Sequence, residues 1–111
     1  GTGMAGSSVA GDRAATGTFK NTICIGFGPG AKTLYVADIG NYRVRAIDLS
    51  TGKVSTVAGN GKKGVPTDGE PAAEQPLLDP RAVAADAKGN IYILERVGHA
   101  LRVVSPDGKI K

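Results

Sequence analysis

The sequence repeats itself with a period of about 58 residues, and this repeat constrains the fold more than any other feature. An offset of 58 pairs Gly6 with Gly64, and after a one-residue gap an offset of 57 pairs Tyr35 with Tyr92. Glycines, turn residues and apolar runs recur in the same order in both copies. One supersecondary unit therefore occurs twice in this chain.

Each copy contains short segments with the pattern of β-strands, rich in β-branched and apolar residues and bounded by turn residues. The predicted strands are residues 34–37, 43–47 and 53–58 in the first copy and 82–86, 91–94 and 100–105 in the second. Pro106-Asp107-Gly108 is a turn signature, because Pro presets one dihedral and Gly accepts positive φ. Residues 70–78 can form one helical turn at most, since Pro71 and Pro76 interrupt them.

Four short strands in meander order after a long loop are typical of one blade of an all-β propeller. The strings from Tyr35 to Arg45 and from Ser55 to Gly61 resemble NHL repeats, which are named for an Asn-His-Leu signature. Asn41 matches the Asn and Tyr42 stands at the His position. In the second copy His99 matches the His, whereas Gly98 replaces the Asn and Glu95 replaces the usual Asp. The resemblance implies a β-propeller, usually six-bladed, and no single activity.

The chain is too short for a closed ring of blades. Residues 1–58 make up a first blade with the loop that leads into it, and residues 59–111 make up a second blade that lacks most of its outer strand. This amounts to about one and three-quarter blades, whereas propellers close with about four to eight. We expect either a piece of a longer propeller or a homo-oligomer in which several copies complete the ring.

Composition restricts the classes of function. Fourteen basic against ten acidic residues give a net charge of +4, which weakly favours anionic partners. A single cysteine excludes an internal disulfide, and with only one histidine we expect neither a metal site nor a cofactor. No stretch approaches the roughly 18 apolar residues of a membrane span. A signal peptide pattern is also absent, so no membrane contact is expected and the compartment stays open.

Gly59 to Gly64 has the glycines and lysines of a phosphate-binding loop, but Val65-Pro66 follows in place of Ser or Thr and a helix. A nucleotide site is therefore not predicted.

Chain topology predicts which end of the blades carries function. Strands of a meander alternate in direction, so the leading loops 1–22 and 59–80 lie at the same end as the bends 38–42 and 95–99; we call this end the long-loop rim. Long loops on a rigid frame are the usual place for binding. The opposite end, the short-turn rim, consists of residues 28–32, 50–52, 87–90 and 106–108.

Two sets of polar residues are singled out on the predicted long-loop rim. One set has the residue types of turns or of strand-bridging stems, and we assign it a structural role in the repeat. Its members are Asp38, Asn41, Arg45, Glu95 and Arg102. The other set is the candidate binding set, and most of it departs from the repeat. It consists of Arg13, Lys62, Lys63, Arg96 and His99.

The expected function is that of a non-catalytic binding or scaffold module that uses the long-loop rim to bind a protein, peptide or glycan. RNA is an alternative, because some relatives of this family bind it, but no aromatic platform for stacking bases accompanies the basic residues. A second alternative is part of a metal-dependent lyase- or hydrolase-like propeller enzyme. A general base at His99 would need an orienting carboxylate, and Glu95 is the nearest in sequence.

Overall fold

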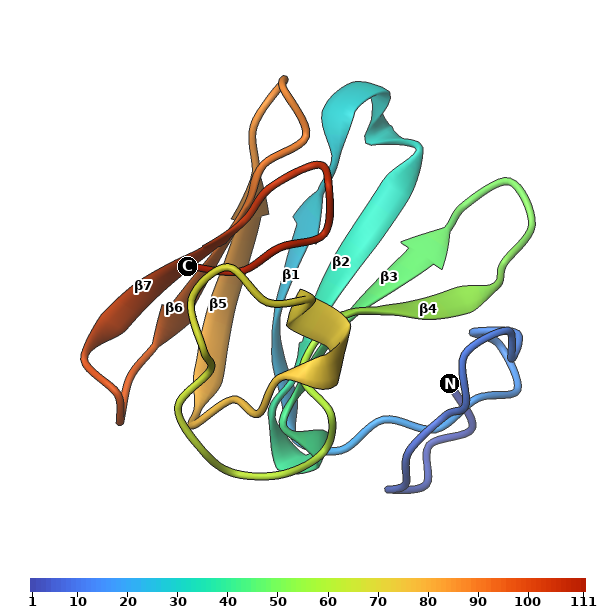
Figure 1. Ribbon diagram of the computed structural model, residues 1–111. Helices are drawn as coiled ribbons and strands as arrows, with labels where there is room; N and C mark the ends of the chain where they lie inside the picture. The colour runs from blue at the N-terminus through green and yellow to red at the C-terminus, as the bar shows by residue number, and fades with distance from the viewer.

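The computed structural model describes all 111 residues, and the chain is all-β apart from three single 3₁₀ turns (Figure 1). A four-stranded antiparallel sheet has the order β1 (Thr22–Phe27), β2 (Thr33–Asp38), β3 (Arg43–Asp48), β4 (Val54–Ala58). A three-stranded antiparallel sheet has the order β5 (Pro80–Ala85), β6 (Ile91–Glu95), β7 (Ala100–Val104). The 3₁₀ turns are Pro29–Ala31, Ile39–Asn41 and Ala72–Glu74. The predicted all-β meander is confirmed, and so is the single helical turn within residues 70–78.

The repeat extends to the details of strand pairing. In the first sheet Thr22 pairs with Asp38 and the register then shifts through a β-bulge. In the second sheet Pro80 pairs with Glu95 and the register shifts in the same way at the same place. Each inner strand therefore begins with the same irregularity, and Thr22 and Pro80 are structurally equivalent.

A fourth strand begins in the second sheet, with one bridge and a pair of backbone hydrogen bonds, at 2.7 and 3.0 Å, between Val103 and Lys111. Ile110 forms that bridge with Val104 of β7. The second sheet thus has three full strands and the start of an outer one, as the sequence predicts. No helix in the structure is long and apolar enough to span a membrane.

The hydrophobic core lies between the two sheets. Strand β5 lies against β1 and β2, so the inner strands of the sheets are neighbours (Figure 1). Gly26 of β1 permits this approach, because a Cβ at that position would lie 2.7 Å from the carbonyl oxygen of Val83. The buried core residues are Ala37, Val44, Ala58, Ala72, Leu77, Val83, Ile91, Ile93, Val104 and Ile110.

Each sheet has one apolar face that the other sheet does not cover. Phe27 of β1 is 59% exposed, and Leu101 of β7 is 60% exposed. Leu101 pairs with Leu94 of β6, which is also exposed. At the equivalent positions of the first sheet, Val44 stands for Leu101 and Ala37 stands for Leu94. Those two residues are fully buried in the core, so the second sheet exposes the face that the first sheet buries.

Each leading loop runs along the free edge of its own outer strand. The Gly11 amide donates to the Val54 carbonyl oxygen, and the Val54 amide donates to Asp12, both at 2.7 Å. In the second copy Gly69 and Glu70 make the same two bonds to Ile110, at 2.7 and 3.1 Å. Unpaired edge strands are open to pairing with other chains, and this arrangement satisfies part of each edge.

The bends 38–42 and 95–99 lie at the opposite end from the short turns, as predicted. The prediction that the leading loops lie wholly at the long-loop rim is wrong, because Ala14 and Ala72 donate backbone hydrogen bonds to Gly52 and Gly108 of the short-turn rim. In Figure 1 the short turns between β1 and β2 and between β5 and β6 lie at the top of the view and the turn between β3 and β4 lies at the right, whereas the bends 38–42 and 95–99 lie lower, with residues 59–62. The predicted position of Arg13 on the long-loop rim is wrong. Arg13 bridges to Lys53 at the start of β4, near the opposite end of that strand, because its loop pairs with the outer edge.

Candidate functional site: a basic long-loop rim

Two buried ion pairs, one in each copy, hold the bends of the long-loop rim. Asp38 pairs with Arg45 at 3.4 Å, and Glu95 pairs with Arg102 at 3.1 Å. Each carboxylate also accepts a backbone N–H from the segment that leads into the inner strand, from Lys20 at 2.8 Å and from Leu78 at 2.7 Å. The carboxylates therefore fasten the bend to the start of the inner strand in both copies.

Arg45 is the more deeply embedded of the two arginines. Its side chain is 2% exposed, and its terminal nitrogens donate to Thr56 Oγ1, Ser7 Oγ and the Ser8 carbonyl oxygen at 2.6–3.0 Å. Burial lowers the pKa of Arg45, and the charge of Asp38 opposes this effect. Arg45 thus ties together two strands and the leading loop.

The bends themselves have a backbone that most side chains avoid. Tyr42 and His99 occupy equivalent positions, and both have left-handed backbone with φ of 51° and 48°. Asn41 donates its amide to the Gly6 carbonyl oxygen at 2.7 Å and to the Asp38 carboxylate. His99 is exposed, and Glu95 bonds Arg102 and Leu78 instead of orienting the imidazole. A general base at His99 oriented by the Glu95 carboxylate, which the sequence left open, is therefore not formed in the structure.

Four of the five candidate binding residues occupy one rim. Lys62 accepts a backbone bond from Leu77 at 3.3 Å, and Lys63 bridges to the same residue. Two residues further along, Asp79 accepts a backbone bond from Arg96 at 3.2 Å, and His99 donates to the Arg96 carbonyl oxygen. The segment 77–79 therefore lies between the lysine loop and the second bend. The side chains of Lys62, Lys63, Arg96 and His99 are all exposed.

The sequence prediction missed two charged residues at this rim, Asp79 and Arg81. Both Arg81 and Arg96 place their Nε on the same carboxylate oxygen, Oδ2 of Asp79, at 3.0 and 3.2 Å. The repeat contained the signal, since Arg81 stands where the first copy has Ile23 and Arg96 stands where it has Ile39. The second copy thus has arginines at two positions where the first copy has isoleucines, and the two arginines meet in space.

The long-loop rim carries the whole charge excess of the chain. Four charged residues of the leading loops, Asp12, Arg13, Asp68 and Glu70, lie where these loops run along the outer strands and are counted with the outer edges. Outside the two buried pairs, the charged side chains of the rim are then Lys20, Arg43, Lys62, Lys63, Arg81, Arg96, Glu74 and Asp79. Six of these are basic and two are acidic, a difference of four, which equals the net charge of +4 for the chain. The outer edges and the short-turn rim together are neutral. A field of one sign at one rim attracts anions to that rim.

The short-turn rim has a different character, because its acidic groups are occupied by their own turns. Hydrogen bonds from the Ser50 side chain and backbone lower the pKa of Asp48. The Asn90 side chain lowers the pKa of Asp86, although slight burial opposes it and backbone bonds from Asn90 and Lys88 assist. Asp86 in turn raises the pKa of Tyr92 by accepting its hydroxyl hydrogen bond.

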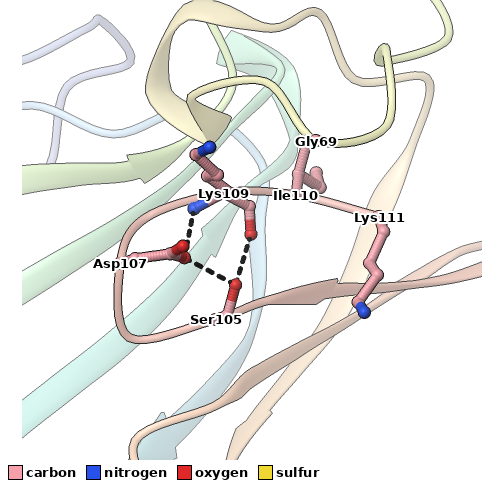
Figure 2. Close-up of a pocket in the computed structure, with 6 residues that line it drawn as sticks. All are labelled: Gly69, Ser105, Asp107, Lys109, Ile110 and Lys111. Carbon is pink, nitrogen blue, oxygen red and sulfur yellow. Dashed lines mark hydrogen bonds between the residues drawn. The ribbon is translucent and has the colours of Figure 1, made fainter.

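A hollow of about 200 Å³ lies at the outer end of the second sheet, away from the long-loop rim (Figure 2). Its polar side chains bond one another: Ser105 donates to Asp107 at 2.7 Å, which lowers the pKa of that carboxyl group, and Asp107 also accepts the Lys109 amide. The residues that line it are Gly69, Ser105, Asp107, Lys109, Ile110 and Lys111. No three His, Cys, Asp or Glu side chains converge in the chain.

Comparison with known proteins supports the propeller interpretation. No family model matches the chain. Over 58 residues, 51% of its length, the chain is 43% identical to human NHL repeat-containing protein 2, of which it spans 8%. A structural-genomics protein of unknown function from Bacteroides thetaiotaomicron superposes on 87% of the chain with a TM-score of 0.69 and 25% identity. An auxiliary nutrient binding protein from the same organism superposes on 78% with a TM-score of 0.62 and 18% identity.

Fold and comparisons together define the class of protein. The chain consists of neighbouring antiparallel sheets arranged as blades of a β-propeller, and it spans 24% of each solved chain. Its repeats are similar to NHL repeats, so the resemblance in the sequence is confirmed.

Proposed function

We propose that the chain is part of a non-catalytic propeller binding module whose long-loop rim docks an acidic segment of a partner protein. The observation that carries this proposal is the charge distribution. Six basic and two acidic side chains gather at the end of the blades where the long loops lie. Fields of one sign accelerate association with oppositely charged partners and select against like-charged ones.

Two alternatives receive less support from the same residues. Binding of single-stranded RNA relies on exposed aromatic side chains on which bases stack, and the rim aromatics Phe19 and Tyr42 are half-buried. An enzyme active site would need groups in mutual reach, and the carboxylate nearest His99 in sequence is bonded to Arg102. An acidic peptide also fits better than a neutral glycan, because charge is the feature that distinguishes this rim.

We further propose that the binding face is part of a ring of several blades. Since the second sheet exposes the face that the first sheet buries, the same packing can be repeated at either end of the pair. We propose that a further blade of the same kind covers each open face. Light scattering on the 111-residue chain tests whether a second copy supplies it: a ring of copies gives a multiple of 11.2 kDa.

A charge series of labelled peptides tests the binding proposal. Fluorescence anisotropy compares a peptide of about eight glutamates with a glutamine peptide of equal length, at salt concentrations from roughly 50 to 300 mM. We expect the glutamate peptide to bind and to weaken as salt rises, and the glutamine peptide not to bind. Equal binding of the two peptides, or displacement of the glutamate peptide by a lower concentration of oligouridine, would overturn the proposal.

A further inference from the structure

We infer that Arg81 and Arg96, held together by Asp79, form a receptor for a carboxylate group of the partner. This inference rests on the proposed function and names the point on the long-loop rim where the acidic segment is held. Its basis is the geometry of three side chains from two different elements. Arg81 lies in the bulge of the inner strand β5, whereas Arg96 belongs to the bend between β6 and β7.

Asp79 fixes both guanidinium groups and leaves them facing solvent. Its carboxylate is buried, and the two arginine side chains are 31% and 66% exposed. Both Nε atoms contact the same oxygen at 3.0 and 3.2 Å, so they lie no more than about 6 Å apart. The backbone N–H of Arg96 also donates to the Asp79 carbonyl oxygen. Part of the entropy of ordering two long side chains is therefore lost before a ligand arrives, more for Arg81 than for the more exposed Arg96.

The terminal nitrogens of this pair are free to bind. Within the chain, Arg81 and Arg96 donate only through Nε, and their Nη groups make no hydrogen bond. The other arginine at the surface of this rim, Arg43, uses its Nη groups on Ser7, Asn41 and Asn60. A guanidinium presents its N–H groups as a planar fork that matches a carboxylate in two parallel bonds. Two such forks side by side match a glutamate or aspartate side chain.

The charge balance favours an anion at this position. Two guanidinium groups around one carboxylate leave a net charge of +1, and the lysine loop with Lys62 and Lys63 adjoins the same segment. A role in building the blade would place similar residues in both copies, as it does for Asp38 with Arg45 and Glu95 with Arg102. The first copy instead has Asn21, Ile23 and Ile39 at the three equivalent positions. The cluster is thus an addition to the repeat unit.

The test follows the arginine Nε–H signals of the ¹⁵N-labelled 111-residue chain during titration with the glutamate peptide. We expect the signals of Arg81 and Arg96 to shift, whereas that of the buried Arg45 stays in place. In parallel, anisotropy compares R81Q and R96Q with R13Q, which removes the same charge at the outer edge. Loss of charge-assisted hydrogen bonds should weaken binding about tenfold for each rim variant and less than about twofold for R13Q. R96K keeps the positive charge but not the planar fork, and it should bind the glutamate peptide about as weakly as R96Q does.

Each contrary outcome has a separate meaning. If the glutamate peptide binds but R81Q, R96Q and R13Q behave alike, the receptor is refuted while the proposed function stands. If the peptide does not bind at all, the proposed function fails and this inference fails with it. If R96K restores full affinity, charge alone suffices and the receptor geometry is refuted. If inorganic phosphate shifts the same two signals at lower concentrations than the peptide, the assignment to a carboxylate is wrong. Circular dichroism of each variant establishes that it is folded.

Discussion

Arg45 and Arg102 occupy the same position in the repeat but have different surroundings, so removing each side chain gives a controlled measure of what burial contributes. We consider R45A and R102A. Arg45 is 2% exposed and bonds four partners, whereas Arg102 is 16% exposed and bonds only Glu95. In both variants a carboxylate remains that still accepts one backbone N–H.

The two costs should differ clearly. R45A leaves the fully buried Asp38 charge without its partner and removes the link to the leading loop, so the free energy of unfolding should fall by about 3–5 kcal/mol. R102A also leaves a fully buried carboxylate, Glu95, but it breaks no bond to a leading loop or to a second strand, so the loss should be smaller than that in R45A. R13A at the exposed outer edge should change the free energy by less than about 0.5 kcal/mol.

Urea unfolding measures these differences. The chain has no Trp, so far-ultraviolet circular dichroism or tyrosine fluorescence follows the transition. R45K keeps the charge and the stem but not the fork, and should fall between the wild type and R45A; it also gives a measurable transition if R45A does not fold. A loss in R102A equal to that in R45A, or a loss below about 1 kcal/mol in R45A, would refute the burial argument.

Four further results are expected. The folded-state pKa of Asp86 lies below its ordinary value of 3.8. Its contribution to stability is therefore present above pH 3.8 and is lost as the pH falls through the folded-state pKa. In D86N the midpoint of urea unfolding should depend less on pH between about pH 5 and 2 than it does in the wild type. The same variant should let Tyr92 form its phenolate at lower pH, seen as absorbance near 295 nm, because the hydrogen bond that raises its pKa is weakened. G26A should destabilise the chain by about 1–3 kcal/mol, since the new Cβ would meet the backbone oxygen of Val83, and an unchanged midpoint would contradict the packing of β1 on β5. If copies associate through the open faces, L101E should lower the solution mass found by light scattering. An equal mass for the wild type and L101E would exclude association through the face that contains Leu101.

The sequence predicted those parts of the fold that depend on periodic patterns. Alternation and turn residues located the strands, and the repeat located the second sheet and the start of its outer strand. The path of the leading loops was not predictable in this way. Their position is set by backbone N–H and C=O groups at the free edge of β4, which carry no residue-type signal. For that reason Arg13 lies at the opposite end of its blade from the predicted one.

The candidate site was predictable only in part, for a related reason. Lys62, Lys63, Arg96 and His99 were found because a loop rim and departures from the repeat identify exposed residues. The pairing of Arg81 with Arg96 joins residues from two elements through Asp79, and no single stretch of sequence displays it. Comparing the two copies at every position, rather than at the loops alone, would have shown both isoleucine-to-arginine replacements.

The bonds between each leading loop and its outer strand have a consequence for folding. In the first unit they join Asp12 to Val54, and in the second they join Glu70 to Ile110, so each unit closes on itself through its first and last segments. During synthesis the leading loop emerges first and has no partner until about forty residues later, a closure whose entropic cost grows only slowly with loop length. Because the two units are equivalent, the leading loop of one matches the outer strand of the other. We therefore expect exchange of leading loops between units, a form of domain swapping, to be the characteristic misfolding event of this repeat.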